Sequence, residues 1–326
     1  MRRIMTIFAV LTVLVLASCQ RRPFAENTTE VKLLLSVNTQ IVNNDDSVQL
    51  PETMRLNLYD PQTGELRYTD FISPTGGVIY PLPGDYDLVV YNMGTESTQI
   101  RNHDSFSEME AFTSEVSSFL KSQLRKFLEM RSKLLAKAEQ AAEEEKIVYE
   151  PDHLFVGHVR SVNIPAILEG EQQGDITIEV DAHSVVETWN VTLDNVDGIE
   201  WVSKVSAIIS GQAESHFIGR QEDSENPVSI YFEMKPDTKN GTITGKFNTF
   251  GKHPTVQSDL NLDLNVVDTG GEEHHYHFDV NSDFFDNPEL DIVVEEKVTI
   301  EEPVSGGGGF VPTVNDWEEV KTEINI

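Results

Sequence analysis

Histidine and acidic residues alternate with aromatic ones in one short segment, and this spacing could place ligands for a metal ion. On a β-strand, His275, His277 and Asp279 would share one face, with alternate Cα atoms roughly 7 Å apart, which suits two imidazoles on one ion. An exposed strand explains the same residues, with the histidines in solvent and Tyr276 and Phe278 turned toward a core. The exposed strand is the favoured interpretation.

Motifs for other chemistry are absent from the sequence. Asp279, Asn281 and Asp283 begin like a calcium-binding loop, but the sixth position is Phe284 instead of glycine and the twelfth is Leu290 instead of glutamate. The chain has no Gly-x-Ser-x-Gly elbow, no phosphate-binding Gly-x-x-x-x-Gly-Lys and no His-Glu-x-x-His. The sequence therefore predicts a protein that is not an enzyme and has no cofactor.

The one cysteine of the chain lies where a lipid could be attached. Arg2 and Arg3 precede an apolar stretch, residues 4–16, which ends in Leu-Ala-Ser-Cys at Cys19. This stretch is too short to cross a bilayer, which needs about 20 apolar residues. The Leu-Ala-Ser-Cys box resembles the lipobox of bacterial lipoproteins, in which the thiol is acylated. We therefore expect cleavage between Ser18 and Cys19, and a lipid on Cys19.

Charge excludes one class of partner. The chain has 24 basic and 55 acidic residues, for a net charge of -31, and removal of Arg2 and Arg3 with the signal leaves -33. Binding to nucleic-acid phosphates requires a basic surface, so we expect no nucleic-acid partner. Cys19 has no second cysteine to pair with, so stability must come from a hydrophobic core.

Short runs with strand character follow a polar tether and occupy most of the chain. Met54, Leu56 and Leu58 alternate with polar residues, as in a half-buried strand, and Asn240-Gly241 is a strong turn signal. Many strands at short spacing predict antiparallel sheets. The expected strands are 31–37, 54–59, 76–80, 84–91, 154–156, 176–180, 185–193, 203–209, 228–234, 241–250, 260–267 and 274–280.

One region has a different pattern. Residues 105–146 lack glycine and proline and carry apolar residues at helical spacing, from Phe112 to Leu135. Ser105 and Glu108 fit a capping box, and a helix from Ser105 to Lys146 would be about 60 Å long. Its apolar stripe is expected to pack on its own domain, with an assembly contact as the alternative. Its basic residues are interpreted as a solvated face: Lys121, Arg125, Lys126, Arg131, Lys133 and Lys137.

The last segment reads as a hinge followed by a strand. Gly306–Gly309 is a flexible run, and beyond it Val320, Thr322, Ile324 and Ile326 alternate with polar residues. Such a strand can add to an exposed sheet edge, either in its own chain or in another subunit.

Several of these segments, in this order, resemble the Bacteroides-type FimB-like superfamily of fimbrillin-associated anchor and minor-subunit lipoproteins, including its uncharacterised lipoprotein branch. The resemblance covers most of the mature chain. The matching segments are the lipobox with Arg21-Arg22-Pro23, 54–59, 75–77, 83–86, 151–155, Ser210-Gly211, 243–251 and the tail 310–326 with Trp317. The long helical insertion and the basic residues after Cys19 depart from the family pattern.

The resemblance implies a mainly β fold of two tandem transthyretin-like antiparallel β-sandwich domains, with the long helical insertion in the first. The expected division is 1–18 signal peptide, 19–30 lipidated tether, 31–162 first domain with the insertion at 105–146, 163–305 second domain, and 306–326 hinge and terminal strand.

The resemblance also implies a non-enzymatic outer-membrane lipoprotein that anchors, caps or decorates a fimbria-like surface assembly. Its partners would be a membrane lipid and fimbrial subunits or similar lipoproteins. Surface exposure is expected, and the periplasmic face stays open. The alternative function is capture of a glycan or host protein through sandwich loops, for which Trp189 and Trp201 are the candidates, although both lie in strand-like surroundings.

Overall fold

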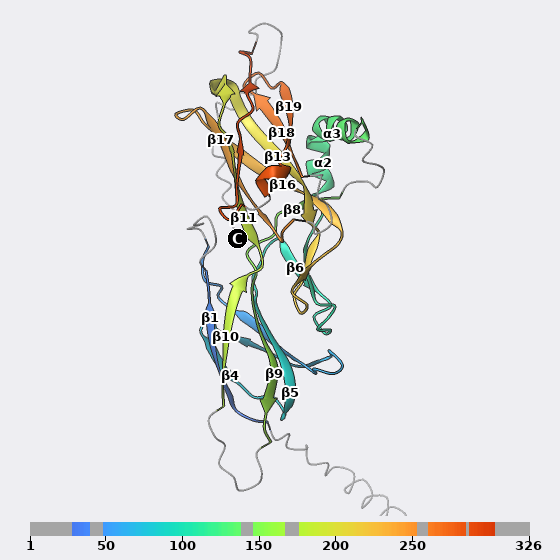
Figure 1. The fold of residues 1–326 in the computed structure, drawn as a ribbon, viewed down its shortest axis with the longest axis vertical. Coiled ribbons are helices and arrows are strands. Elements are labelled where there is room, and N and C mark those ends of the chain that lie inside the picture. The colour runs from blue at the N-terminus through green and yellow to red at the C-terminus, as the bar shows by residue number, and fades with distance from the viewer. Residues whose placement is uncertain are drawn as a thin grey trace, which may run out of the picture. The chain divides into compact units, whose positions relative to one another are not determined.

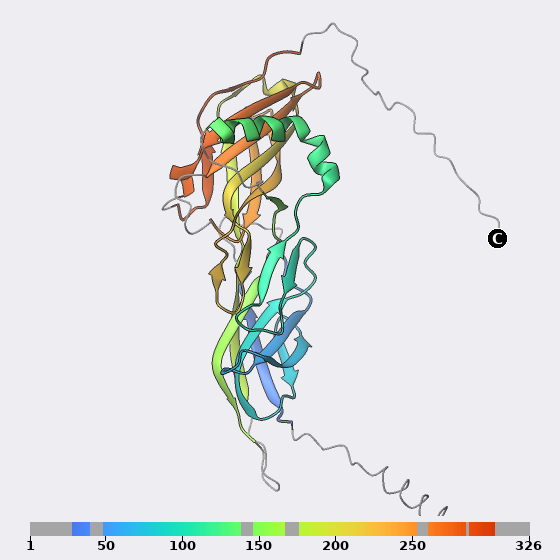
Figure 2. The same ribbon diagram turned by 90° about the vertical axis from the view of Figure 1, so that its right-hand side faces the viewer.

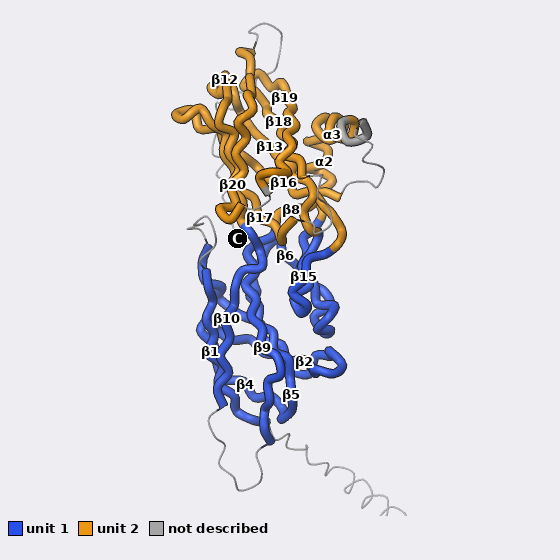
Figure 3. Tube along the Cα trace, in the orientation of Figure 1, with its two compact units in different colours: residues 1–114, 151–187, 214–224 blue, residues 115–150, 188–213, 225–326 orange. Residues whose placement is uncertain are grey.

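The computed structural model describes residues 28–39, 48–137, 146–166, 176–252, 260–284 and 287–303. These residues are mainly strands with few helices, which confirms the predicted mainly β class (Figure 1). They form two compact units (Figure 3). Unit 1 contains the described residues up to Ser114 together with 151–187 and 214–224. Unit 2 contains the described residues of 115–150 and 188–213 and those from Glu225 onward.

Unit 1 is built around a seven-stranded sheet. In sheet order its strands are β3 (Leu66–Ile72), β2 (Met54–Tyr59), β5 (Gly84–Asn92), β9 (Phe155–Ile164), β10 (Thr177–Ser184), β1 (Val31–Val37) and β4 (Gly76–Ile79). Alternate residues of β1, namely Val31, Leu33 and Leu35, are buried in the core of the unit, because successive side chains of a strand point to opposite faces.

The two edge strands of this sheet meet. A short turn joins β3 to β4, with Ser73 bridged to Gly76, and the Tyr80 amide donates to the Tyr68 hydroxyl at 3.2 Å. The sheet therefore curls around its core in the manner of a sandwich or barrel.

A four-stranded sheet completes unit 1, in the order β15 (Glu222–Asp223), β14 (Ser215–Phe217), β7 (Glu110–Thr113) and β6 (Thr98–Arg101). Phe112 lies in β7, opposite Ser215 of β14, so the prediction of a helix beginning at Ser105 is wrong. Pairing with a strand about 100 residues away overrides the local helical spacing, which contains no information about distant partners.

Unit 2 contains an eight-stranded sheet. Its order is β19 (Glu273–Asp279), β18 (Asn261–Asp268), β13 (Val202–Ala213), β16 (Pro227–Asp237), β17 (Thr242–Thr249), β11 (Glu187–Leu193) and β20 (Asp291–Val294), with β8 (Ile147–Tyr149) beside β16. The turn between β16 and β17 contains Gly241 with φ of 71°, which confirms the Asn240-Gly241 turn signal.

The strand spacing predicted antiparallel sheets, but the sheets are mixed. β1 pairs with β10, β11 with β20, and β8 with β16, all in parallel. Two short strands, β12 (Val196–Asp197) and β21 (Val298–Thr299), extend the β11–β20 pairing, also in parallel. Parallel neighbours come from distant parts of the chain, so spacing along the sequence does not reveal them.

The helices belong to unit 2. α2 (Ser118–Gln123) begins at Ser117, whose hydroxyl caps the Leu120 amide at 3.2 Å, and α3 (Arg125–Lys137) follows it. Figure 2 shows α3 lying across the strands of this unit. The apolar stripe of the predicted helix therefore packs on a sheet of its own unit. Val116, Leu124 and Phe127 form one buried cluster with Ile147, Ile208 and Tyr231. None of the helices in the described residues is long and apolar enough to cross a membrane.

This division differs from the one expected from the sequence. The expected boundary at residue 163 falls inside β9, and the helices lie in the second unit rather than the first. The reason is topological, because the chain passes between the units several times. A division read along the sequence assumes that each domain is one continuous segment.

Candidate functional site

The residues singled out for metal binding lie on β19 but do not form a metal site. His277 Nδ1 lies 2.6 Å from Asp263 Oδ1, while the His275 ring stacks on Phe127 with ring centres 5.6 Å apart. Asp279 is exposed and accepts from the Asn281 amide at 3.0 Å. Within the described residues, no group of three or more His, Cys, Asp or Glu side chains is arranged to hold a metal ion.

The other face of β19 agrees with the exposed-strand interpretation. Phe278 is buried in the core of unit 2 and Tyr276 packs against that core. The histidine face is covered only in part, because the His275 ring stacks on Phe127 of α3, whereas His277 and Asp279 are exposed as expected. Burial lowers the pKa of His275, so the ring that stacks on Phe127 stays neutral at neutral pH.

Beneath α3 lies a buried ion pair. Arg131 Nε donates to Asp263 Oδ2 at 2.5 Å, and both side chains are almost fully buried, with exposed fractions of 3% and 2%. Burial lowers the pKa of Arg131, which its contact with Asp263 opposes. The prediction that Arg131 belongs to a solvated face is therefore wrong. A cavity of about 260 Å³ adjoins the pair, lined by Phe127, Met130, Arg131, Asp263, His275, Tyr276 and His277.

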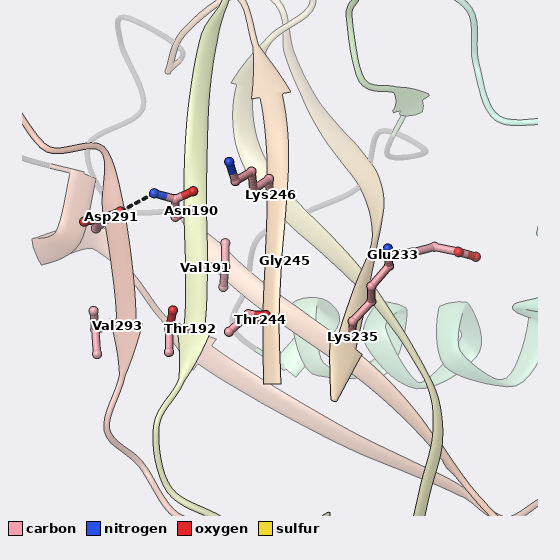
Figure 4. Close-up of a pocket in the computed structure, with 10 residues that line it drawn as sticks. All are labelled: Asn190, Val191, Thr192, Glu233, Lys235, Thr244, Gly245, Lys246, Asp291 and Val293. Atoms are coloured by element: carbon pink, nitrogen blue, oxygen red, sulfur yellow. Dashed lines mark hydrogen bonds between the residues drawn. The ribbon is translucent and has the colours of Figure 1, made fainter. Parts of the chain in front are cut away.

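Another hollow of unit 2 is an open trough of about 590 Å³ (Figure 4). Lys235 and Lys246 line it from β16 and β17, and Asn190 on β11 donates to Asp291 on β20 at 2.6 Å. At the β20 side of the trough, the Val293 side chain is 47% exposed.

The trough ends at a sheet edge. Among the described strands, β20 pairs within its sheet with β11 alone. The carbonyls of Leu290 and Val294 accept from the amides of Asn190 and Asp194. Because hydrogen-bonding direction alternates along a strand, the backbone of Val293 faces away from β11. An extended segment could therefore pair with β20 on that side.

The two tryptophans considered for ligand capture are part of the core region. Trp189 is 3% exposed in the core of unit 2, and Trp201 packs against the same core. Neither presents its ring as a binding surface on a loop.

Other expected site residues lie outside the described residues. These are Ser18 and Cys19, with the predicted cleavage and lipid, and the terminal strand with Val320, Thr322, Ile324 and Ile326. Sequence reasoning missed the β20 edge. The β-branched run Ile292-Val293-Val294, which follows Pro288, is the signal that could have found it.

The described residues define a mainly β protein with sandwich- or barrel-like sheets. The family described as "Domain of unknown function (DUF5119)" matches residues 18–233, and the chain belongs to this family.

Two relatives extend the comparison. A candidate fimbrium anchoring subunit of Bacteroides ovatus, Fim4B, is 24% identical over 94% of this chain and 93% of its own. The crystal structure of a candidate adhesin from Bacteroides ovatus has a TM-score of 0.59 at 22% identity, covering 88% of this chain and 98% of the other. The first relative confirms the resemblance to fimbrial anchor and minor-subunit proteins, and the second supports the fold.

Proposed function

We propose that this protein is a non-enzymatic lipoprotein that anchors, caps or decorates a fimbria-like assembly at the outer membrane, through strand pairing between subunits. The observation that carries the proposal is the similarity to the Fim4B protein over 94% of the chain, because it includes both units. In this proposal the units are transthyretin-like sandwiches, and partners bind at a sheet edge. A lipid on Cys19 holds the protein in the membrane.

The lipid part of the proposal has a direct test. We expect Cys19→Ala to move the protein from the membrane fraction to the soluble fraction, because the variant lacks the thiol that would carry the lipid. Fractionation of cells with either form measures this. Ser18→Ala serves as the control, because it keeps the thiol and a small residue beside it. A Cys19→Ala protein that stays membrane-bound after loss of residues 1–18, as checked by N-terminal mass spectrometry, contradicts the proposal.

Protease shaving of intact cells then separates the two faces of the membrane. Digestion of the membrane-bound native protein from outside supports a surface anchor or cap. Protection from protease, with the same membrane binding, replaces the surface role with one on the periplasmic side.

The strand-pairing part of the proposal concerns two elements. One is the β20 edge. The other is the terminal strand with Val320, Thr322, Ile324 and Ile326, which would pair with a sheet edge of its own chain or of a partner subunit. Val293→Pro tests the edge, because it removes the amide that faces away from β11 and leaves the bonds to β11 in place.

We expect Val293→Pro to weaken retention on filaments sheared from cells by roughly tenfold. One backbone hydrogen bond contributes about 0.5–1.5 kcal/mol, and the proline ring also obstructs a neighbouring strand. Val293→Ala is the control, since it shortens the side chain but keeps the amide. Equal retention of the two variants would show that β20 is not the pairing edge.

A further inference from the structure

The end of unit 1 where its first strand begins carries an exposed apolar surface. Tyr80 and Leu82 lie in the connection between β4 and β5, and their side chains are 52% and 45% exposed. Pro165 and Ala166, which follow β9, are also exposed. Both segments lie at one end of the sheet, because Gly84 at the start of β5 pairs with Ile164 at the end of β9 (Figure 1).

This surface is held in a fixed conformation. The Tyr86 hydroxyl donates to the Leu82 carbonyl at 2.9 Å, which holds the turn before β5. The Tyr80 amide donates to the Tyr68 hydroxyl at 3.2 Å. Gly84 leaves room for the Tyr86 hydroxyl, which lies 3.2 Å from the position that a Cβ would take. The apolar side chains are therefore presented by a braced loop, so little conformational entropy is lost when they bind.

The start of the described chain is bonded to this loop. The Thr29 amide donates to the Pro81 carbonyl at 2.9 Å, and the Thr29 hydroxyl donates to the Pro165 carbonyl at 3.0 Å. Cys19 lies nine positions before Thr28 in the sequence, a length that spans at most about 30 Å. A lipid on Cys19 would therefore keep this end of unit 1 close to the bilayer.

We propose that Tyr80 and Leu82, with Pro165 and Ala166 beside them, form a membrane-contact surface that inserts into the headgroup region of the bilayer. The inference rests on the lipid at Cys19, which is part of the proposed function. Tyrosine favours the membrane interface because its ring is apolar and its hydroxyl is polar, and leucine adds apolar area. Glu30 and Asp85, which are exposed at the same end, would stay at headgroup level.

Fluorescence quenching in vesicles tests this contact. Cys19 is the only cysteine and its thiol carries the lipid in the mature protein, so Leu82→Cys provides one site for a bimane label. The full lipidated chain is placed in phosphatidylethanolamine and phosphatidylcholine vesicles with brominated acyl chains. Met93→Cys is the matched control. It is 40% exposed and lies just beyond β5 in the same unit, roughly 30 Å from Leu82.

We expect bromine to reduce the fluorescence of the label at position 82 by roughly twofold and to leave the label at 93 unchanged, because interfacial side chains reach about 5–10 Å into the headgroup boundary. Melting curves confirm that both variants fold. Unquenched fluorescence at 82, in protein whose N-terminal peptide carries lipid by mass spectrometry, overturns this inference alone. A peptide without lipid overturns both the inference and the proposed anchor.

Discussion

Replacing Arg131 with alanine is expected to destabilise unit 2 by about 3–5 kcal/mol. The change leaves the Asp263 carboxylate, with 2% of its side chain exposed, without the guanidinium that donates to it. His277 still contacts Asp263, but it is 38% exposed and solvent weakens its electrostatic contribution. The free energy of unfolding in urea measures the effect.

Tryptophan fluorescence makes this measurement specific to unit 2. The three tryptophans, at positions 189, 201 and 317, all fall outside the segments of unit 1. Lys126→Ala is the matched control on the same helix, because Lys126 pairs with Glu273 at 3.2 Å while 70% exposed, and such pairs contribute about 0–1 kcal/mol. Similar losses for the two variants would contradict a special role for the buried pair.

A double variant separates charge from packing. Arg131→Met combined with Asp263→Leu removes both charges and fills the site with apolar side chains, and buried ion pairs can be replaced in this way at little cost. We expect the double variant to unfold with a free energy closer to the native value than Arg131→Ala. A double variant as unstable as Arg131→Ala would indicate that the pair stabilises α3 by its hydrogen bonds.

The second large effect is expected at Gly198. This residue has φ of 76°, and an added Cβ would lie 1.9 Å from the Ile300 carbonyl oxygen. Gly198→Ala must therefore push the β21 region away from β12, where the Ile300 amide donates to the Asp197 carbonyl. Val298 and Ile300, with 0% and 3% of their surfaces exposed, would leave the core of unit 2.

Gly241→Ala provides the control for Gly198→Ala. Gly241 has a similar φ of 71°, but nothing lies within 4 Å of its added Cβ, so the variant has the backbone strain without the clash. We expect a loss of about 1–2 kcal/mol for Gly241→Ala and at least about 2 kcal/mol more for Gly198→Ala. Hydrogen exchange at residues 298–300 should rise for Gly198→Ala alone. Equal unfolding free energies would rule out the steric explanation.

Local patterns in the sequence predict the strands well and their partners poorly. β1 and β2 have the predicted bounds, because alternation of buried and exposed residues is a local property. The apolar residues around Phe112 have a spacing that is also compatible with a helix. Pairing with the distant strand β14 makes this segment a strand instead. For parallel pairs such as β11 and β20, no local sequence pattern identifies which strand is the partner.

The candidate sites show the same limit. Trp189 lies in the core as its strand-like surroundings indicated, whereas Arg131 is buried although it lies in a cluster of basic residues. Its ion pair with Asp263 joins residues 132 positions apart, and no helical pattern reports such a partner. The β20 edge exists because β11 is the only one of the described strands of this sheet that pairs with β20, and this is a property of the assembled sheet.

The interleaved course of the chain has a consequence for the order in which the protein can fold. The four-stranded sheet of unit 1 needs β14 and β15 from residues 214–224, which are synthesised after residues 115–150 and 188–213 of unit 2. Unit 1 therefore cannot be complete before residue 224 is synthesised, although N-terminal domains that are one continuous segment can fold as soon as they emerge. The seven-stranded sheet of unit 1, by contrast, has all of its strands once β10 ends at Ser184. Truncation after residue 162 should give a fragment that does not fold, because it lacks β10 of the seven-stranded sheet and both β14 and β15 of the four-stranded sheet.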